Sequence, residues 1–574
     1  MTRLSKPILY FILLALVAGS TTSCRVFKKN KEQSTATGWN YNDPEQGGFE
    51  KFDFTGQDNG PGLILVEGGS FLMGATQDYL IMEQDNEPRR VTVRSFYMDQ
   101  TEVSNLHYLE FLYWMKRVFY SQATMDYQQY YLAQLPDTLV WRAQLAYNEP
   151  MVNLYLRHPA YRDYPVVGVS WLQASEFCRW RTDRVNEIRL FEKGIYSLDL
   201  GYDANDFFTT DAYLTNQYIK GDQQPGTNER LGLPDISATV GQGNAGTAGG
   251  GGQAPLRHAR IEDGIILPAY RLPTEAEWEF AALGLLGNSE FENIRERRIY
   301  PWNGNFTRGS NPEDGEIGRF MANFKRGRGD YMGIAGSLND GADVPAPVIS
   351  YYPNDYGLYN MAGNVSEWVA DVYRRESSQD VSDMNPFRGN VFTAPVTTSS
   401  GGQQIDNSRV PDTSYVEPNV VFDRNAGPTG AYKEEKSYNP DYRRIKRTAV
   451  NPSVDPTLPF RRNYRTADNR NYLDGDWASL QSDQGGNWKK QGENKQATNF
   501  MYNNGDWTGS IAGEGATTLI TDRTRVYKGG SWKDGAYYMS PGQRRFLEEN
   551  LSTDFIGFRC AMDRVGTSYE GQAY

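Results

Sequence analysis

The stretch GLYNMAGNVSEW, residues 357–368, decides the fold together with segments on both sides of it. Upstream stand GLILVEGGSFLMG at 62–74, YPVVGVSW at 164–171 and RLPTEAEWE at 271–279, and downstream stand KGGSW at 528–532 and GFRC at 557–560. The joint order of these segments is highly specific, and they mark one domain over 61–563. Residues 184–266 and 374–520 do not share the pattern, so we expect them to be insertions, with 564–574 as a tail.

Local patterns around these segments predict short strands and three helices. Residues 63–73 and 91–98 contain strand-like apolar runs. Ser104 is expected to cap a helix, while Ser170 and Thr274 each open a capping box, in which the side chains of the first and fourth residues satisfy backbone N–H groups. Gly284 stands where the third helix should end.

Taken together, the segments resemble the formylglycine-generating-enzyme family, also called the sulfatase-modifying-factor domain. The resemblance implies that family's compact α+β fold, which is low in regular secondary structure and related in topology to C-type lectins.

The cysteines argue against the family's oxidase chemistry. Members that oxidise a substrate cysteine use two copper-binding cysteines shortly after the Gly-Gly-Ser-aromatic motif. Here that stretch reads KDGAYYMSPGQR, residues 533–544, and there is no cysteine between Cys178 and Cys560. Because thiolate ligation and thiol redox chemistry need thiols, we expect no copper site and no catalytic residues. The chain is therefore predicted to be a pseudoenzyme.

Calcium is the metal that the resemblance still implies, in a structural role. Hard cations prefer a mixture of carboxylate, amide and carbonyl oxygens. The family's two calcium sets map onto Asn360, Gly363, Val365 and Glu367, and onto Asn323, Phe324, Asp340 and Ala342. Glycine, valine, phenylalanine and alanine would act through their backbone carbonyls. The alternative for the first set is that Asn360 and Glu367 tie a turn by hydrogen bonds.

The resemblance also implies a disulfide between Cys178 and Cys560, because the enzymes pair cysteines at both matching positions. These would be the two thiols left after acylation of Cys24, and an exported protein meets oxidising conditions. The alternative is two separately buried free cysteines.

The amino terminus has the order of an export signal. Arg3 and Lys6 precede the apolar run 8–18, and small residues lead to Cys24. The order resembles a bacterial lipoprotein signal, with 1–23 removed, Cys24 lipidated and 24–60 as a flexible tether. In the lipoproteins that this signal resembles, basic residues after the cysteine, as at Arg25, Lys28 and Lys29, go with the periplasmic face of the outer membrane. The alternative is a plain signal peptide.

A closer resemblance is to the gliding-motility lipoproteins of Bacteroidota. It rests on the signal, on TGW at 37–39, DTLVW at 137–141 and YLRHPAY at 155–161, and on the long late insertion. It implies a non-catalytic scaffold of the gliding and type IX secretion machinery, with other secretion lipoproteins and periplasmic ring components as partners. The alternatives are a calcium-dependent binder of glycan or peptidoglycan and an enzyme with residual oxidase activity.

Composition excludes other classes. The net charge of −12 without a clustered basic face is not that of a nucleic-acid binder. The three histidines, His107, His158 and His258, are too scattered for a multi-histidine metal site. The alternating Glu275, Glu277 and Glu279 suit a helix amino end better than acid–base catalysis. The 12 Trp and 38 Tyr favour core packing over a glycan groove.

Overall fold

The computed structural model describes the first and last family segments and many of the residues between them. The described residues are 32–54, 56–75, 86–120, 130–143, 147–198, 201, 207–214, 232–237, 256–286, 298–302, 304–309, 317–327, 342, 344–373, 386–387 and 524–566, with four further strands between 393 and 449.

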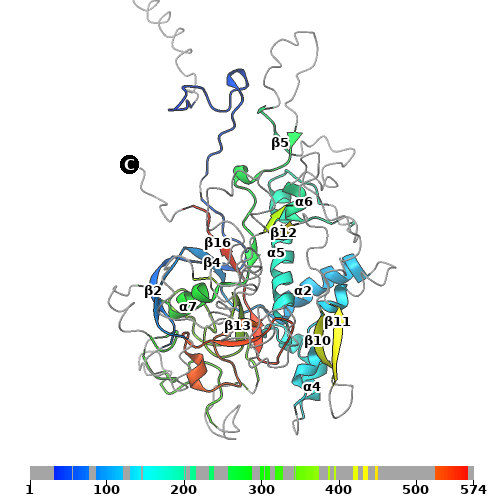
Figure 1. Cartoon of the computed structure of the whole chain (residues 1–574), viewed down its shortest axis with the longest axis vertical. Coiled ribbons are helices and arrows are strands. Elements are labelled where there is room, and N and C mark those ends of the chain that lie inside the picture. Colours follow the sequence, from blue (N-terminus) through cyan, green and yellow to red (C-terminus); the bar gives the residue numbers. More distant parts are fainter. Residues whose placement is uncertain are drawn as a thin grey trace, which may run out of the picture.

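Two small four-stranded sheets form the centre of the domain (Figure 1). The first has the order β1 (Leu63–Val66), β4 (Phe96–Asp99), β16 (Ala561–Asp563), β7 (Tyr270–Arg271). The second has the order β14 (Arg545–Glu548), β13 (Thr524–Lys528), β8 (Ser366–Val372), β15 (Ile556–Phe558), with β15 parallel to β8. The last strands of the chain therefore complete sheets begun by much earlier segments.

The remaining strands form two-stranded pairs. The pair β2 (Gly69–Met73) and β3 (Arg89–Val93) is antiparallel and lies on α7. Further pairs are β5 (Leu233–Pro234) with β6 (Leu256–Arg257), β9 (Thr393–Pro395) with β12 (Arg447–Ala449), and β10 (Pro418–Asp423) with β11 (Ala431–Lys436). The last two pairs fall in the expected insertion 374–520, most of which lies outside the described residues.

The three predicted helix starts are confirmed. Ser104 caps α2 (Asn105–Met115) by accepting from His107 N. Both capping boxes are complete, at Ser170 for α5 (Trp171–Glu192) and at Thr274 for α7 (Glu275–Leu283). Gly284 ends α7 in the left-handed conformation, with a φ of 56°, as predicted. Two shorter helices are α4 (Glu149–Leu154) and α6 (Thr210–Leu214).

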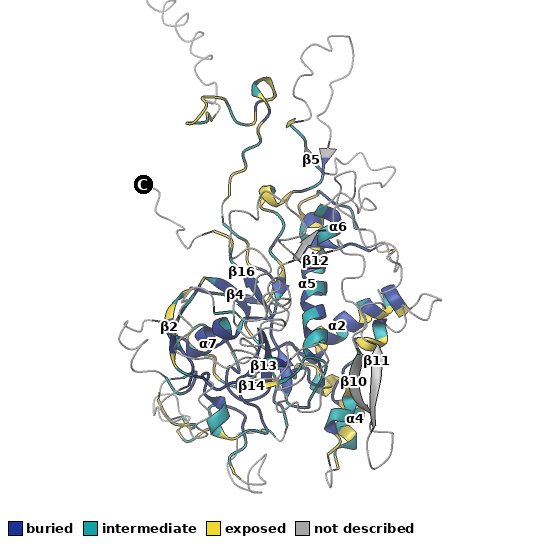
Figure 2. Cartoon of the chain, viewed as in Figure 1, coloured by how far each residue is buried: buried dark blue, intermediate teal, exposed yellow. Residues whose placement is uncertain are grey.

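The core has two main parts. One lies between α2 and α5, where Tyr108 stacks on Phe177, and Phe111 and Phe558 pack edge-on against Phe177. The other surrounds α7, which contacts β2, β3, β8 and β13 and is buried along almost its whole length (Figure 2). Both parts of the core therefore contact strands that carry family segments.

Two regions show more structure than the expected tether and first insertion suggest. Helix α5 continues to Glu192, beyond residue 184, and Leu190, Tyr196 and Phe208 form a small separate cluster behind it. In the segment 32–54, the Glu50 carboxylate forms a buried ion pair with Arg257 at 3.0 Å. The domain boundaries stay predictions. Among the described residues, no helix combines the length and the apolar character needed to cross a bilayer.

Candidate functional site

The stretch 357–368, called the loop 357–368 below, consists of a tight turn over 357–365 and the first three residues of β8, and it is hydrogen-bonded to three distant segments. Gly363 N donates to Gly529 O at 2.8 Å, and Trp532 N donates to Asn364 O at 2.9 Å. Asn360, Gly363 and Asn364 have φ values of 52°, 75° and 62°. A Cβ on Gly363 would lie 2.4 Å from Asn323 O, so only glycine fits this left-handed position without a shift of the backbone.

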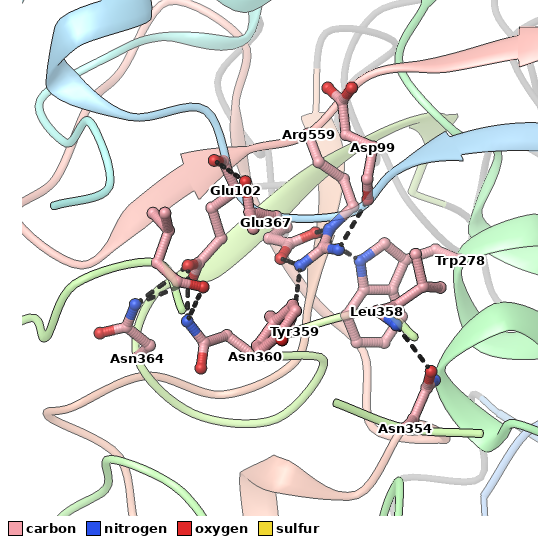
Figure 3. A network of polar contacts seen from close by, with 12 residues as sticks. Asp99, Glu102, Trp278, Asn354, Leu358, Tyr359, Asn360, Asn364, Glu367 and Arg559 are labelled. Carbon is pink, nitrogen blue, oxygen red and sulfur yellow. Dashed lines mark hydrogen bonds and ion pairs between the residues drawn. The ribbon is translucent and has the colours of Figure 1, made fainter. Parts of the chain in front are cut away.

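Glu367, at the end of this loop, forms an ion pair with Arg559 of the last family segment. Arg559 Nε donates to Oε2 and Nη2 donates to Oε1, each at 2.6 Å, and Trp278 Nε1 donates to Oε2 at 2.7 Å (Figure 3). Both charged side chains are fully buried. Burial alone would lower the pKa of Arg559, but the Glu367 carboxylate raises it above its ordinary value.

A second buried carboxylate, Glu102, lies beside this pair, and no cationic side chain among the described residues lies at hydrogen-bond distance from it. It accepts from Asn360 Nδ2 at 2.9 Å and from Asn364 Nδ2 at 3.0 and 3.1 Å. Burial, followed by repulsion from Glu367, raises the pKa of Glu102 to about 8. Within the described part of the chain, the carboxyl groups of Glu102 and Glu367 thus share one guanidinium, that of Arg559, and a proton or a bound cation would balance the second carboxylate.

The first expected calcium set fits this network in part. Asn360, Gly363, Val365 and Glu367 are all buried in one loop. Asn360 Oδ1 is buried and has no hydrogen-bond partner among the described residues, which is expected of a cation ligand when the cation is absent. The Glu367 carboxylate, however, is engaged by Arg559 and Trp278, and Figure 3 shows the Asn360 oxygen pointing away from it. A calcium ion here would rely mainly on the amide and carbonyl oxygens.

The second expected calcium set lies next to the first. Asn323 is buried, and its Nδ2 donates to Val344 O at 2.9 Å and to Asn364 Oδ1 at 3.4 Å. Phe324 packs edge-to-face on Phe320. Asp340, the single carboxylate of the set, lies outside the described residues, and Ala342 has no described sequence neighbour. The second calcium set as a whole therefore stays a prediction.

Residues 533–544, which match the stretch with the copper-binding cysteines of the enzymes, hold other side chains in this chain. Asp534 forms a two-pronged ion pair with Arg545 at 2.7 and 2.8 Å and also accepts from Ser531 Oγ. Met539 is fully buried in a cluster with Tyr300 and Phe320. Arg545 Nη2 additionally donates to Ser366 Oγ at 2.8 Å, which ties this stretch to the loop 357–368. This stretch thus holds an ion pair and a buried thioether.

Sequence reasoning missed a buried charge cluster beneath α7. Lys528 Nζ lies 2.8 Å from Glu279 Oε2 and 3.3 Å from Glu275 Oε1, and Arg544 Nη2 lies 2.7 Å from Glu275 Oε2. Burial would raise the pKa of Glu275, but Arg544 and Lys528 together lower it below its ordinary value. Glu275 and Glu279 form ion pairs with partners that lie 249 to 269 positions away in the chain. These pairs support a structural role for both glutamates.

The two remaining cysteines meet in the core. Cys178 on α5 and Cys560 at the end of GFRC are both buried, and their Sγ atoms lie 3.3 Å apart as thiols. The disulfide itself stays a prediction. Cys24 lies outside the described residues.

The other polar candidates have local roles. His158 Nδ1 accepts from Ala160 N at 3.1 Å, so it caps a short turn. Within the described ranges, no group of three or more His, Cys, Asp or Glu side chains could hold a metal ion. The amide and carbonyl sets discussed above are a different type of site.

Comparison with known proteins places this geometry in a family. Residues 49–418 match the sulfatase-modifying factor enzyme 1-like domain. A formylglycine-generating enzyme of Thermomonospora curvata is 38% identical over 149 residues, which are 25% of this chain and 43% of that enzyme. The inactive Cα-formylglycine-generating enzyme 2 of Bos taurus is 34% identical over 142 residues, 24% of this chain and 37% of that protein. These matches span less than half the length of either relative.

Among solved structures, PvdO from Pseudomonas aeruginosa aligns over 87% of this chain and 94% of its own, with 13% identity and a TM-score of 0.34. The domain match covers well over half of the chain, and the described architecture is α+β with little regular secondary structure. The chain belongs to the family of proteins with a sulfatase-modifying factor enzyme 1-like domain.

Proposed function

We propose that this chain is a non-catalytic, lipid-anchored scaffold at the periplasmic face of the outer membrane. The observation that carries the non-catalytic part is the packing of 533–545. Asp534 is paired with Arg545, Met539 is buried, and the sequence offers no thiol in this stretch. Copper-dependent oxidation of a cysteine by this family needs two thiolates at this place, so the residues present do not support that reaction.

The relatives are compatible with either a catalytic or a non-catalytic role for this chain. They include proteins named formylglycine-generating enzymes and proteins named inactive Cα-formylglycine-generating enzyme 2. Catalysis is therefore not a property of every member, and the local chemistry of each chain decides it. In this chain the local chemistry favours a structural or binding role.

The scaffold role in gliding motility and type IX secretion rests on sequence resemblance. The lipoprotein-like signal, the three short segments at 37–39, 137–141 and 155–161, and the late insertion resemble the gliding-motility lipoprotein GldJ, with its paralogue GldK as second choice. We infer that the insertion 374–520 carries partner contacts, because a segment of that length without a function is improbable inside a domain. The partners would be secretion lipoproteins and periplasmic ring components.

The test is crosslinking of intact envelopes followed by purification of the full chain. We expect other secretion lipoproteins to co-purify with the wild type, and much less with a Cys24→Ala variant that has lost its membrane anchor. Purification of the chain alone from crosslinked envelopes would contradict the scaffold proposal.

The competing function is a residual oxidase, and a copper titration with turnover of a thiol peptide tests it directly. The expected result is neither stoichiometric copper(I) binding at 533–545 nor peptide oxidation. Copper-dependent turnover would overturn the pseudoenzyme assignment whatever the partners are.

A further inference from the structure

The segment 32–54, which follows the expected lipid anchor, has a structure of its own. Asn42 and Lys51 exchange two hydrogen bonds, in which Lys51 N donates to Asn42 Oδ1 at 2.8 Å and Asn42 Nδ2 donates to Lys51 O at 3.0 Å. Glu50 attaches the segment to the first insertion through its buried ion pair with Arg257. This part of the expected tether is therefore folded and docked on the domain.

Two large aromatic side chains of the segment are turned to solvent. Trp39 is 59% exposed and Phe49 is 66% exposed. They lie near each other, because the Trp39 ring packs on Gly47, where an added Cβ would come within 2.9 Å of it, and Phe49 follows two residues later. Figure 1 shows the segment, in dark blue, above the two central sheets. Neighbouring exposed aromatic rings on a projecting segment point to a contact with a partner or a membrane. Trp39 and Phe49 are called the aromatic pair below.

The position of the expected anchor favours the membrane over a protein partner. Glu32 lies eight residues after Cys24, and eight residues of fully extended chain span at most ~29 Å. Acyl chains on Cys24 would thus keep the aromatic pair near the bilayer surface at all times. A short link gives the bilayer a high effective concentration at the segment, so even a weak affinity is enough for contact.

The side chains around the aromatic pair suit a lipid surface. Tryptophan is enriched at the level of the lipid headgroups, where its ring is partly apolar and partly hydrogen-bonded. Residues 25–31 contain four basic and no acidic side chains, which anionic headgroups attract. Two carboxylates of the segment are neutralised by ion pairs, Glu32 by Lys51 and Glu50 by Arg257.

We propose that Trp39 and Phe49 insert into the headgroup region of the membrane that carries the lipid anchor, and that this second contact orients the domain. An anchor on a flexible link would leave the domain free to rotate, whereas two attachment points restrict it. With the segment on the bilayer, α4, at the opposite end of the described structure in Figure 1, faces away from the membrane. The inference rests on the lipid anchor of the proposed function and adds an orientation to it.

The test is spin-label spectroscopy of the full lipidated chain in vesicles of phosphatidylethanolamine and phosphatidylglycerol. A nitroxide is attached at Phe49→Cys and, as the matched control, at Tyr147→Cys. Tyr147 is an aromatic residue, 84% exposed, that lies next to α4. Cys178 and Cys560 are buried, so they should not take up the label.

We expect the ratio of collisions with lipid-soluble oxygen to collisions with a water-soluble nickel complex to be several-fold higher at position 49 than at position 147. Trp39→Ala in the chain labelled at 49 should shift this ratio toward the value at 147, because the segment loses half of its aromatic contact. Both labelled positions are exposed in the wild type, so these variants should fold normally.

Three results would overturn the inference. If the chain floats with the vesicles and both labels report water, the segment does not touch the bilayer, although the anchor and the scaffold role stand. If the label at 49 reports water in vesicles but is immobilised in intact envelopes, a protein covers the aromatic pair. If the chain does not float with the vesicles at all, it carries no lipid anchor, which contradicts the anchored scaffold and this inference together.

Discussion

Arg559 and Glu367 lie 192 positions apart in the chain and form a two-pronged ion pair that is completely buried. The pair links the loop 357–368 to the strand segment that closes the domain. Because each charge depends on the other for compensation inside the core, the closing segment and the central loop are expected to fold as one unit.

We expect Arg559→Met to destabilise the domain strongly, by about 3–5 kcal/mol, since it leaves Glu367 as an uncompensated buried charge. Chemical denaturation of the purified chain measures this. The matched control is Arg142→Met, because Arg142 pairs with Glu149 at the surface, where both side chains are about half exposed. Loss of an exposed pair should cost less than about 1 kcal/mol. Equal effects of the two variants would mean that the buried pair is not a structural requirement.

The raised pKa of Glu102 predicts that the folded state becomes less stable as the pH rises. The pKa of Glu102 is raised from 4.5 to about 8. At any pH between these two values, the folded state therefore keeps a proton on Glu102 that the unfolded state has released. Where the folded state binds more protons, stability falls with rising pH, by at most about 1.4 kcal/mol per pH unit for one group. Thermal melting in chelator from pH 5 to pH 8 should show this decline for the wild type, and Glu102→Gln should flatten it. A decline of the same slope in both proteins would contradict the assignment.

Calcium binding should stabilise the chain if the first ligand set is right. Ligand that binds only the folded state raises stability by about 2.7 kcal/mol at a hundredfold excess over Kd. We expect chelation to lower the melting temperature of the wild type and to have less effect on Asn360→Gly. Glycine keeps the left-handed backbone conformation of Asn360 and removes the amide. Asn42→Gly, at another asparagine with a φ of 56°, is the control. If chelation leaves the wild-type melting unchanged, the loop is a hydrogen-bonded turn.

The amino terminus predicts lipidation at Cys24. The charged, apolar and small-residue order ends at this cysteine, and acyl chains would hold the chain on a membrane. Cys24→Ala should move the protein from the membrane to the soluble fraction, and an inhibitor of lipoprotein signal peptidase should block maturation of the wild type. Wild-type protein that carries no acyl label would contradict this prediction.

The sequence allowed prediction of those features that depend on neighbouring residues. Ser170 and Thr274 were identifiable as caps because a capping box is complete within four residues. The family segments likewise predicted the fold. The contacts of Glu102 with Asn360 and of Lys528 with Glu279 span 258 and 249 positions, and no local pattern marks them. The buried charges come from segments far apart in the chain, so the pairing of distant strands brings them to one place.

The last prediction is the disulfide between Cys178 and Cys560. Helix α5 and the closing segment bring the two sulfur atoms to 3.3 Å in the core. In an oxidising compartment, two thiols at this distance should form a bond with a small movement of the side chains. A crosslink across so large a loop would stabilise the folded state by roughly 4–5 kcal/mol in the loop-closure model, less any native strain.

Thiol counting on denatured, unreduced protein from the envelope decides between the bond and two free cysteines. We expect no reactive thiol before reduction and two after it, with Cys24 blocked by its lipid. Cys178→Ala should expose one free thiol at Cys560 and lower the melting temperature, whereas reduction should not change the melting of that variant further. Two free thiols in the unreduced wild type would show that the pair is buried as separate cysteines, and the core packing of α5 alone would then have to hold the closing strand.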